Sequence, residues 1–246
     1  MLSKSQIKLI TSLAKKKYRK QHQFFVVEGI KSISEFLKSE FQLHQLFTIE
    51  EGLFSIDNLK STLINETEFN KISFLTNPNK ALAIFKIPEP NTINTNQLIV
   101  ALDNVSDPGN LGTIIRLCDW FGISNLVCSL ETVDCYNPKV VQASMGSLTR
   151  VNVNYVNLEI FLEKQKDLPL YGTFMKGENI YSTKVDDKGV LVLGNEANGI
   201  RNSIEELITK KISIPRFGKT QETESLNVAT AASILLSEFK RRSIEK

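Results

Sequence analysis

The chain has few cysteines, few histidines and no apolar run long enough to span a membrane. Its three cysteines, Cys118, Cys128 and Cys135, are odd in number and lack Cys-x-x-Cys spacing, so the sequence indicates neither a disulfide framework nor a zinc site. We expect these side chains to be reduced and packed. The two histidines, His22 and His44, also lack metal-ligand spacing, and we predict no metal site.

The start of the chain is polar and rich in lysine, and it lacks the apolar core of a signal peptide. The composition of 41% hydrophobic and 23% charged residues is ordinary for a globular protein of 246 residues. These features predict a cytoplasmic protein with one large domain, or with a small domain and a larger one.

Positive charge is concentrated in the first 96 residues, which carry 13 Lys and Arg against 9 Asp and Glu. A basic segment attracts polyanions by neutralising phosphates and releasing counterions. A solvated helix face is the simpler interpretation of a lysine cluster taken alone. The cations that precede the first acidic residue are Lys4, Lys8, Lys15, Lys16, Lys17, Arg19 and Lys20.

Apolar periodicity predicts two parts joined by a linker. Apolar residues at 7, 10, 13 and 14 predict a basic amphipathic helix at the N-terminus. The segment 88–96 is polar, contains two prolines and lacks periodicity. We therefore place a small α/β domain at residues 1–90 and a larger domain at 97–246. The other elements predicted in the first part are strands at 24–27, 43–49 and 81–87 and a helix at 31–38.

Strands and helices alternate in the larger part, which predicts an α/β fold with a mostly parallel sheet and helices on both faces. Predicted helices cover 111–121, begin near Pro138 and close the chain at 226–242. We expect Trp120 in the core rather than as an RNA-stacking platform. The predicted strands are 98–102, 125–129, 151–155, 170–174, 190–193 and 211–214.

Three turns that follow apolar segments carry most of the functional information. In the first, Asn110-Leu-Gly-Thr-Ile-Ile-Arg116, the spacing predicts that Asn110, Thr113 and Arg116 approach one helix face. A helix cap with a surface arginine is a purely structural alternative. A dinucleotide-binding turn is another, because two glycines here match part of its pattern, but Asp107 replaces the first glycine and would repel a pyrophosphate.

The second turn is Leu193-Gly-Asn-Glu-Ala-Asn-Gly199, directly after a predicted buried strand. Gly194 lets the backbone approach a ligand closely, and Gly199 permits a positive φ. Glu196 at a strand end is costly unless it is paired or solvated. Alone it is an ordinary turn residue, but beside the first turn it becomes a counter-charge for Arg116 or for a cationic ligand.

The third turn is Ile214-Pro-Arg-Phe-Gly218, which runs into Glu224-Ser-Leu-Asn-Val-Ala229. Ser225 is a suitable helix N-cap by residue type. Asn227 falls in the first turn of the predicted helix, where propensity gives it no purpose. Its amide is therefore a candidate to hold a ligand or to join the turns.

Together the three turns resemble the motifs of the SpoU (TrmH) family of RNA ribose 2'-O-methyltransferases. The resemblance lies in the Asn110-x-Gly112-x-x-x-Arg116 spacing, in Gly194-Asn195-Glu196 and in Ser225-Leu226-Asn227. Lys15-Lys-Lys-Tyr-Arg19 and Phe25-Val-Val-Glu-Gly29 also look like the substrate-binding domain of that family, which is related to ribosomal protein L30e.

The resemblance implies a SPOUT fold with a trefoil knot, a homodimer with its active site at the interface, and S-adenosylmethionine (SAM) as methyl donor. The implied substrate is structured RNA, with 23S rRNA favoured by the extra N-terminal domain and tRNA as the alternative. The implied catalytic residues are Arg116, Asn110, Glu196, Ser225 and Asn227. The implied cofactor residues are Gly194, Asn195, Ile214, Pro215, Gly218 and Leu226. The implied RNA contacts are Lys15, Lys16, Lys17, Arg19 and Lys20.

In the family the arginine that corresponds to Arg116 activates the 2'-hydroxyl. An arginine stays protonated in proteins, so we expect Arg116 to orient the hydroxyl and stabilise charge while an RNA phosphate accepts the proton. Two other classes stay open, a non-catalytic RNA-binding or ribosome-assembly factor and a nucleotide-dependent oxidoreductase. The chain departs from the pattern in Arg216, which replaces a methionine, and in residues 219–224, which lengthen the loop by about three residues; both should reshape the cofactor loop locally.

Overall fold

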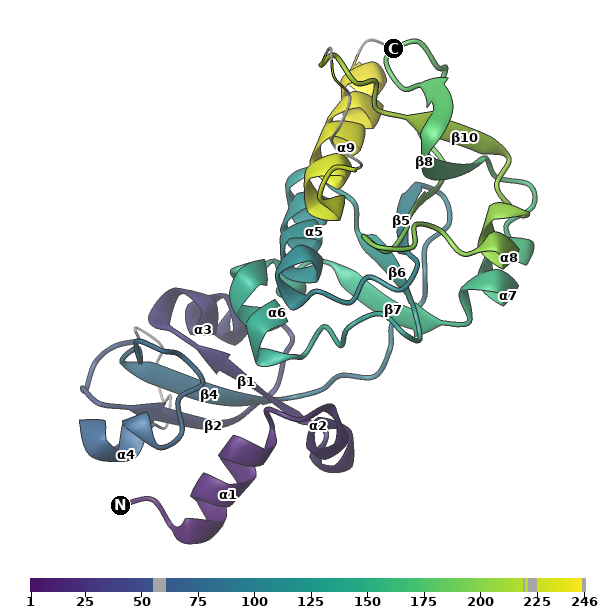
Figure 1. Ribbon diagram of the computed structural model, residues 1–246. Helices are drawn as coiled ribbons and strands as arrows, with labels where there is room; N and C mark the ends of the chain where they lie inside the picture. Colours follow the sequence, from purple (N-terminus) through teal and green to yellow (C-terminus); the bar gives the residue numbers. More distant parts are fainter. Residues whose placement is uncertain (55–60, 219, 221–224, 245–246) are drawn as a thin grey trace. The chain divides into compact units, whose positions relative to one another are not determined.

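The computed structural model describes residues 1–54, 61–218, 220 and 225–244. The chain divides into two compact units, drawn in Figure 1. The N-terminal unit contains residues 1–89 and 134–149, and the C-terminal unit contains residues 90–133 and 150–246. One unit therefore ends beside the predicted linker. The N-terminal unit also includes residues 134–149, which were predicted to belong to the larger domain.

The N-terminal unit is built on a mixed four-stranded sheet in the order β1-β4-β2-β3. β4 is antiparallel to both β1 and β2, and β2 is parallel to the short β3. Its elements are α1 (Lys4–Ser12), α2 (Lys16–His22), β1 (Phe24–Glu28), α3 (Ile30–Leu37), β2 (Leu43–Thr48), β3 (Thr62–Leu63), α4 (Glu66–Asn70), β4 (Ala81–Lys86), α6 (Pro138–Ser144) and the short 3-10 helix η1 (Ser147–Thr149).

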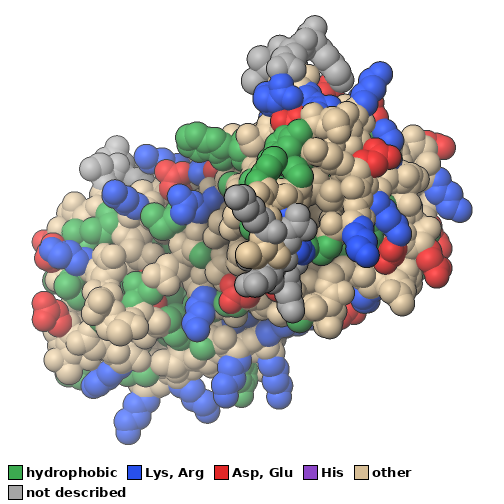
Figure 2. Space-filling view, turned by 45° about the horizontal axis from the view of Figure 1, so that its top comes forward, with side chains coloured by type: hydrophobic (Ala, Val, Ile, Leu, Met, Phe, Trp, Pro, Cys, Tyr) green, Lys and Arg blue, Asp and Glu red, His purple; other side chains and the backbone are tan. Residues whose placement is uncertain are grey.

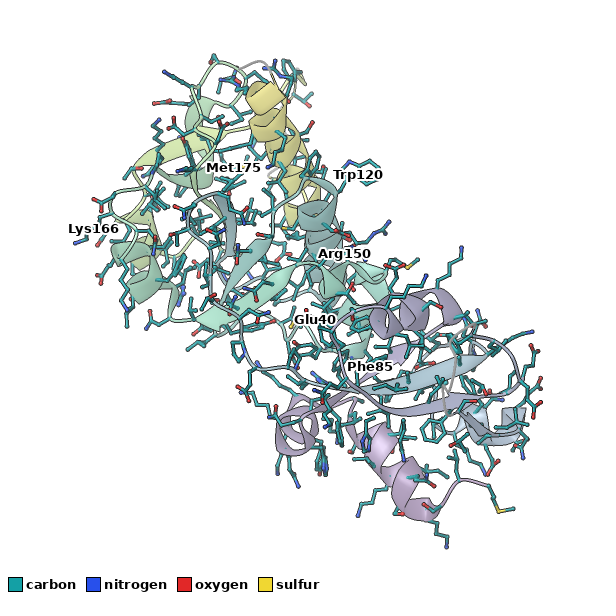
Figure 3. The ribbon with its side chains drawn as sticks, turned by 180° about the vertical axis from the view of Figure 1, so that it is seen from behind. Glu40, Phe85, Trp120, Arg150, Lys166 and Met175 are labelled. Carbon is teal, nitrogen blue, oxygen red and sulfur yellow. The ribbon has the colours of Figure 1, made fainter. Side chains whose placement is uncertain are left out.

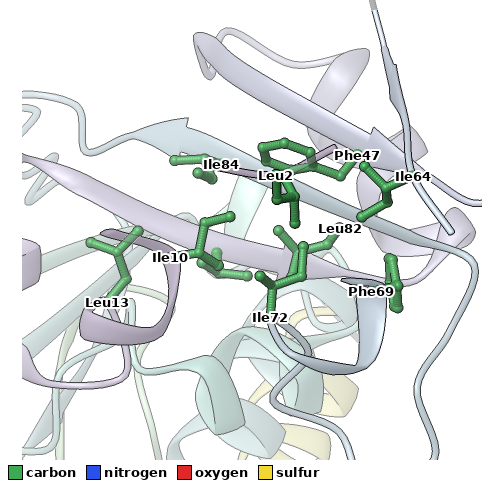
Figure 4. Close-up of a cluster of buried hydrophobic side chains, with 10 residues drawn as sticks. Leu2, Ile10, Leu13, Phe47, Ile64, Phe69, Ile72, Leu82 and Ile84 are labelled. Carbon is green, nitrogen blue, oxygen red and sulfur yellow. The ribbon is translucent and has the colours of Figure 1, made fainter. Parts of the chain in front are cut away.

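The predicted N-terminal amphipathic helix is α1. It begins at a capping box in which the Ser3 hydroxyl accepts from the backbone N–H of Gln6 and the Gln6 side chain accepts from the backbone N–H of Ser3. Ile10 of α1 and Leu13 just after it are fully buried against the sheet, in the cluster shown in Figure 4. Each side chain of this size contributes roughly 1.5–3 kcal/mol when it is fully buried. Hydrophobic burial thus fixes α1 to the sheet and leaves its lysines in solvent.

The C-terminal unit contains a six-stranded, all-parallel sheet in the order β10-β8-β9-β5-β6-β7. Every residue of β5, β6 and β9 is buried, which is expected for central strands covered by helices on both faces. The elements are β5 (Leu98–Leu102), α5 (Pro108–Trp120), β6 (Asn125–Ser129), β7 (Asn152–Val156), α7 (Leu158–Glu163), β8 (Leu170–Asn179), β9 (Gly189–Leu193), α8 (Asn202–Glu205), β10 (Lys210–Ser213) and α9 (Val228–Ile244).

The strand order reverses around β5. From β5 the chain runs outward through β6 to β7, and it then returns to the other side of β5 with β8 and β9. In open parallel sheets, ligands bind outside the carboxyl ends of the strands at such a switch point. The fold therefore directs attention to the turns after β5 and β9. The knot implied by the resemblance stays a prediction.

The expectation that Trp120 lies in the core is wrong. Its side chain is 84% exposed in the last turn of α5, and Figure 3 shows it projecting away from the ribbon. Arg116, one helical turn earlier, is exposed as well. This face of α5 is thus open to solvent in the single chain.

The three cysteines are buried and form no disulfide, as expected. Burial, with a smaller contribution from the charge of Asp119, raises the pKa of the Cys118 thiol to about 12. A thiol of this kind stays protonated at neutral pH and is not a nucleophile. No helix in the described part of the chain is long and apolar enough to cross a membrane.

Candidate active site

The turns after β5 and β9 meet because these two strands are neighbours. Leu102, the last residue of β5, is paired with Leu193, the last residue of β9. α5 begins at Pro108, where Asp107 accepts a hydrogen bond of 2.8 Å from the backbone N–H of Asn110. Asp107 is therefore the N-cap of α5. This role accounts for the acidic residue that opposed a dinucleotide-binding turn.

Three side chains, one from each predicted turn, form a continuous hydrogen-bond chain. Asn227 Nδ2 donates to Asn110 Oδ1 over 2.8 Å, and Asn110 Nδ2 donates to Glu196 Oε1 over 2.6 Å. The residues are 117 and 86 positions apart in sequence. This three-segment hydrogen-bond chain brings together the starts of α5 and α9 with the turn after β9.

Asn227 also caps α9, which begins at Val228 rather than at Leu226. Its Oδ1 accepts hydrogen bonds from the backbone N–H groups of Ala229 (3.0 Å) and Thr230 (3.2 Å). The interpretation of Ser225 as the cap is thus wrong, because Ser225 precedes the cap by two residues and is exposed. Asn227 has the structural purpose that helix propensity did not reveal.

The turn after β9 is closed by its own backbone and by Asn195. The backbone N–H of Asn195 donates to Gly199 O, and that of Gly199 donates to Asn195 O. Gly199 has the predicted positive φ, at 68°. A Cβ on Gly194 would lie 2.3 Å from the carbonyl carbon of Gly199, so the close approach at Gly194 is to the turn itself. The Asn195 side chain bonds to Asn104 O and to the backbone of residues 197 and 198, and thus builds the turn.

Asp103 and Arg201 hold the base of this turn, and no sequence pattern indicated either residue. Asp103 directly follows β5, has no exposed surface, and accepts from the backbone N–H of Arg201 (2.8 Å) and from its Nε (2.7 Å). Arg201 Nη2 also lies 3.8 Å from Glu131 Oε2. The pKa of Glu131 is lowered, first by a hydrogen bond from its own backbone N–H, then by Ser129 and by the charge of Arg201.

Arg116 is not part of the three-segment hydrogen-bond chain. It follows Asn110 by six residues in α5, about 9 Å along the helix axis, and its side chain is exposed. Within the described residues it makes no hydrogen bond or ion pair. Of the two predicted roles of Glu196, the pairing with Arg116 is not present in the single chain, and the role as counter-charge for a cationic ligand stays a prediction. Glu196 bonds instead to Asn110.

The predicted cofactor residues lie after β9, after β10 and before α9. Ile214 and Pro215 are half-buried, whereas Gly218 and Leu226 are exposed. Because the strands are parallel, their carboxyl ends lie on one edge of the sheet. The residue that departs from the family pattern, Arg216, places Nη2 3.9 Å from Met175 Sδ. Most of the longer loop, at 219 and 221–224, lies outside the described residues.

The predicted RNA contacts lie in the N-terminal unit, and Arg19 must be removed from them. Lys15, Lys16, Lys17 and Lys20 are exposed, and Figure 2 shows basic side chains along the lower edge of its view, where Figure 1 draws α1 and α2. Arg19 is only 1% exposed. It forms a 2.5 Å ion pair with Asp134 and donates to two backbone carbonyls. A buried charge needs such partners, so Arg19 is a structural residue.

Fold and candidate site together describe a parallel α/β protein in which strand-end turns are joined by amide and carboxylate side chains at the carboxyl edge of the sheet. The family model described as SpoU rRNA Methylase family matches residues 97–237, and that of the MRM3-like substrate binding domain matches residues 4–83. The chain therefore belongs to the SpoU (TrmH) family of RNA ribose 2'-O-methyltransferases, as the three turns predicted, and carries an MRM3-like substrate-binding domain.

Individual relatives match along almost the whole chain. A 23S rRNA (guanosine(2553)-2'-O)-methyltransferase of Bacillus subtilis is 29% identical over 90% of each chain. The structure of a TrmH-family protein from Porphyromonas gingivalis is 37% identical, with a TM-score of 0.90 over 98% of this chain and 99% of that one. The structure of an AdoMet-bound rRNA methyltransferase from Sinorhizobium meliloti is 28% identical, with a TM-score of 0.85 over 98% and 97%.

Proposed function

We propose that the protein transfers a methyl group from SAM to a ribose 2'-hydroxyl of 23S rRNA. The three-segment hydrogen-bond chain carries this proposal, because it assembles residues of all three family motifs at the edge of the sheet where ligands bind. The Bacillus subtilis relative matches 90% of this chain and is a 23S rRNA 2'-O-methyltransferase, which supports 23S rRNA as the substrate. The proposal includes a cytoplasmic location, which cell fractionation tests.

The residues at the ends of β9 and β10 suit SAM. The cofactor carries no phosphate, and no cationic cradle is therefore needed. Backbone groups at Gly194, Ile214, Gly218 and Leu226 would hold the adenosine part, with apolar surface nearby from Phe217, which is 85% exposed. When bound, SAM supplies an activated methyl group. The protein's contribution is to align the ribose oxygen with that group, and positioning of this kind lowers barriers substantially.

Arg116 would orient the 2'-hydroxyl and stabilise its developing negative charge. An arginine does not accept a proton, so a phosphate of the bound RNA takes it. Glu196, Asn110 and Asn227 would keep the turns in register, while Ser225 faces solvent beside them. Within one chain, Arg116 does not contact the three-segment hydrogen-bond chain. We therefore also propose a homodimer in which the active site forms between two copies. Light scattering on the purified protein should give twice the chain mass.

Steady-state kinetics of methyl transfer from labelled SAM to rRNA test the proposal through Arg116. We expect Arg116→Ala to lower kcat by at least about a hundredfold, in line with the loss of a preorganised charge-stabilising group, while SAM affinity by calorimetry stays within about twofold. A wild-type protein that binds RNA and SAM but methylates no RNA would be a non-catalytic RNA-binding factor. Transfer to tRNA alone would replace the proposed substrate, and binding of NAD(H) without SAM would indicate an oxidoreductase.

A further inference from the structure

The turn that carries Glu196 is attached at both ends to two consecutive residues after β5. At its start, Asn195 Nδ2 donates to Asn104 O over 2.7 Å. At its end, Arg201 donates to both oxygens of Asp103, with its backbone N–H and with Nε. The two attachments use one short piece of backbone as a common base. The position of the turn thus depends on residues 103 and 104.

This base is itself rigid. The backbone N–H of Asp103 donates to Leu193 O at the end of β9, over 2.9 Å. Asn104 adopts a positive φ of 57°, and its backbone N–H donates to Ser129 Oγ over 3.0 Å at the end of β6. The base is therefore joined to both strands that flank β5. It is a fixed reference point at the carboxyl edge of the sheet.

Among the described residues, the Glu196 side chain is held by a single hydrogen bond, so its position depends on the turn that carries it. The residue is exposed, and its carboxylate is joined to the fold by the bond to Asn110. Asp103, by contrast, is completely buried, and a buried carboxylate is stable only when it is paired and hydrogen-bonded. Both of its oxygens are committed to Arg201, so the backbone position and the side-chain direction of Arg201 are fixed together.

We infer that Asp103 and Arg201 are positioning residues for methyl transfer, which hold the turn 194–200 so that Glu196 stays in contact with Asn110. The inference deepens the proposed function and rests on it. Neither residue needs to touch SAM or RNA. A displacement of about 1 Å at a catalytic group can reduce a rate about a hundredfold, so loosening the base of the turn lowers turnover even when the ligands still bind.

Kinetics of Arg201→Ala and Arg201→Lys test this role in the full-length protein. We expect Arg201→Ala to lower kcat by about 10- to 100-fold with KM for RNA within about twofold. Arg201→Lys keeps a cation beside Asp103, and its kcat should lie between those of Arg201→Ala and the wild type. Lys211→Ala is the matched control, because Lys211 forms an ion pair with Glu205 in the same unit and is 48% exposed, against 40% for Arg201. It should keep the wild-type kcat.

A double-mutant cycle separates positioning from general stability. If Arg201 acts through Glu196, Arg201→Ala causes little further loss of kcat in a Glu196→Ala background. Additive losses, or a rise in KM for RNA with unchanged kcat, overturn the inference. If Arg201→Ala does not fold, the same double-mutant cycle with Glu196→Ala is measured for Arg201→Lys.

Amide hydrogen exchange gives a readout that does not depend on activity. The backbone N–H groups of Ala197, Asn198 and Gly199 are hydrogen-bonded within the turn. We expect them to exchange faster in both Arg201 variants and unchanged in Lys211→Ala. Unchanged exchange in the Arg201 variants overturns the inference. A wild type that methylates no RNA would refute the proposed function instead, and the exchange experiment would still decide whether Arg201 holds the turn.

Discussion

At the scale of single residues, the cap of α9 determines the direction of the three-segment hydrogen-bond chain. Asn227 Oδ1 is occupied by two backbone N–H groups, so its Nδ2 must point toward Asn110. Asn110 then has to present its oxygen to Asn227 and its NH2 group to Glu196. A helix cap therefore orients an amide in the proposed active site, and one residue serves stability and function at once.

Asn227→Asp should separate these two effects. An aspartate keeps the capping oxygen but cannot donate to Asn110. If Asn110 turned its amide to compensate, its oxygen would face the Glu196 carboxylate. We expect Asn227→Asp to keep the wild-type free energy of unfolding within about 0.5 kcal/mol, since Asp and Asn are equally good caps, while kcat falls at least tenfold. Asn227→Ala should also lose about 1 kcal/mol of stability. Urea unfolding measures the stability of each variant, and methyl-transfer kinetics measure its kcat. An Asn227→Asp variant with full activity would show that the three-segment hydrogen-bond chain is not needed for methyl transfer.

The residues that the sequence failed to place are those whose partners are distant. Asn110, Glu196 and Asn227 each stand in a turn with a local signal. Asp103 and Arg201 have no such signal, and they meet across 98 positions only because β5 and β9 are neighbours. Arg19 stands among exposed lysines in the sequence, and only the tertiary structure shows that it is buried and paired with Asp134. Pairing of this kind depends on tertiary structure, which residue type alone does not reveal.

At the scale of elements, α9 is fixed near its end by a buried carboxylate between two arginines. Glu238, 7% exposed in its side chain, accepts from Arg241 (2.9 Å) and Arg242 (2.6 Å). Arg242 also donates to the carbonyls of Ile180 and Tyr181, after β8. The hydrogen bond from Arg241, followed by that from Arg242, lowers the pKa of Glu238 to about 2, although burial opposes the shift. The charged Glu238 thus helps to hold α9 against the segment after β8.

This pKa predicts how the contribution of Glu238 depends on pH. A carboxylate whose pKa is lower in the folded than in the unfolded protein stabilises the fold fully above its unfolded value, near 4.5, and loses this effect as pH falls toward 2. We expect Glu238→Gln to lower the urea midpoint at pH 7, with a difference from the wild type that shrinks between pH 5 and pH 3. A difference that is constant over this range would show that the charge of Glu238 is not involved.

The lysines of α2 and its cap predict the salt dependence of RNA binding. A fourfold variant with glutamine at Lys15, Lys16, Lys17 and Lys20 should bind RNA more weakly. The negative slope of log K against log salt concentration should become shallower by up to about three. Lys31→Gln with Lys38→Gln, two exposed lysines of the same unit, is the control. Filter binding at several salt concentrations measures the slope. An unchanged slope in the fourfold variant would place the RNA elsewhere.

Long periodic elements could be predicted from the sequence, and short ones could not. Most strands and the helices α1, α3, α5 and α9 were found because their apolar spacing repeats over several turns or alternations. The missed elements are short or weakly patterned, and β8 extends to Asn179, well beyond its apolar start. There the register with β10 shifts between Lys211 and Ile212, which no local pattern indicates. The helix predicted to begin near Pro138 is α6, and the missed elements are α2, β3, α4, η1, α7 and α8.

At the scale of the whole molecule, the N-terminal unit is assembled from two separate pieces of chain. Residues 134–149 leave the C-terminal unit after β6, join the N-terminal unit and return before β7. Within the N-terminal unit, Tyr136 packs on Phe25 with ring centroids 4.7 Å apart, and Asp134 pairs with Arg19. The substrate-binding domain that the sequence placed at residues 1–90 is thus completed by a segment of the methyltransferase region.

Arg19→Met should reveal how much this contact stabilises the molecule. The substitution keeps an apolar side chain of similar length but leaves Asp134, whose side chain is 14% exposed, without its cation. Breaking a buried ion pair from one side costs about 3–5 kcal/mol, and urea unfolding should show a loss of this size. Lys20→Met, at an exposed neighbour, should change stability by less than about 0.5 kcal/mol. Equal effects of the two substitutions would refute a structural role for Arg19.

Identification of the labelled nucleoside decides whether the protein methylates ribose 2'-hydroxyls of 23S rRNA, as we propose. Ribosomal RNA from a strain that lacks the protein is incubated with the wild-type protein and methyl-labelled SAM, then digested completely to nucleosides. We predict that the label is recovered in one 2'-O-methylnucleoside of 23S rRNA and is lost with Arg116→Ala. Label found only on a base, or no label in 23S rRNA, would contradict the claim.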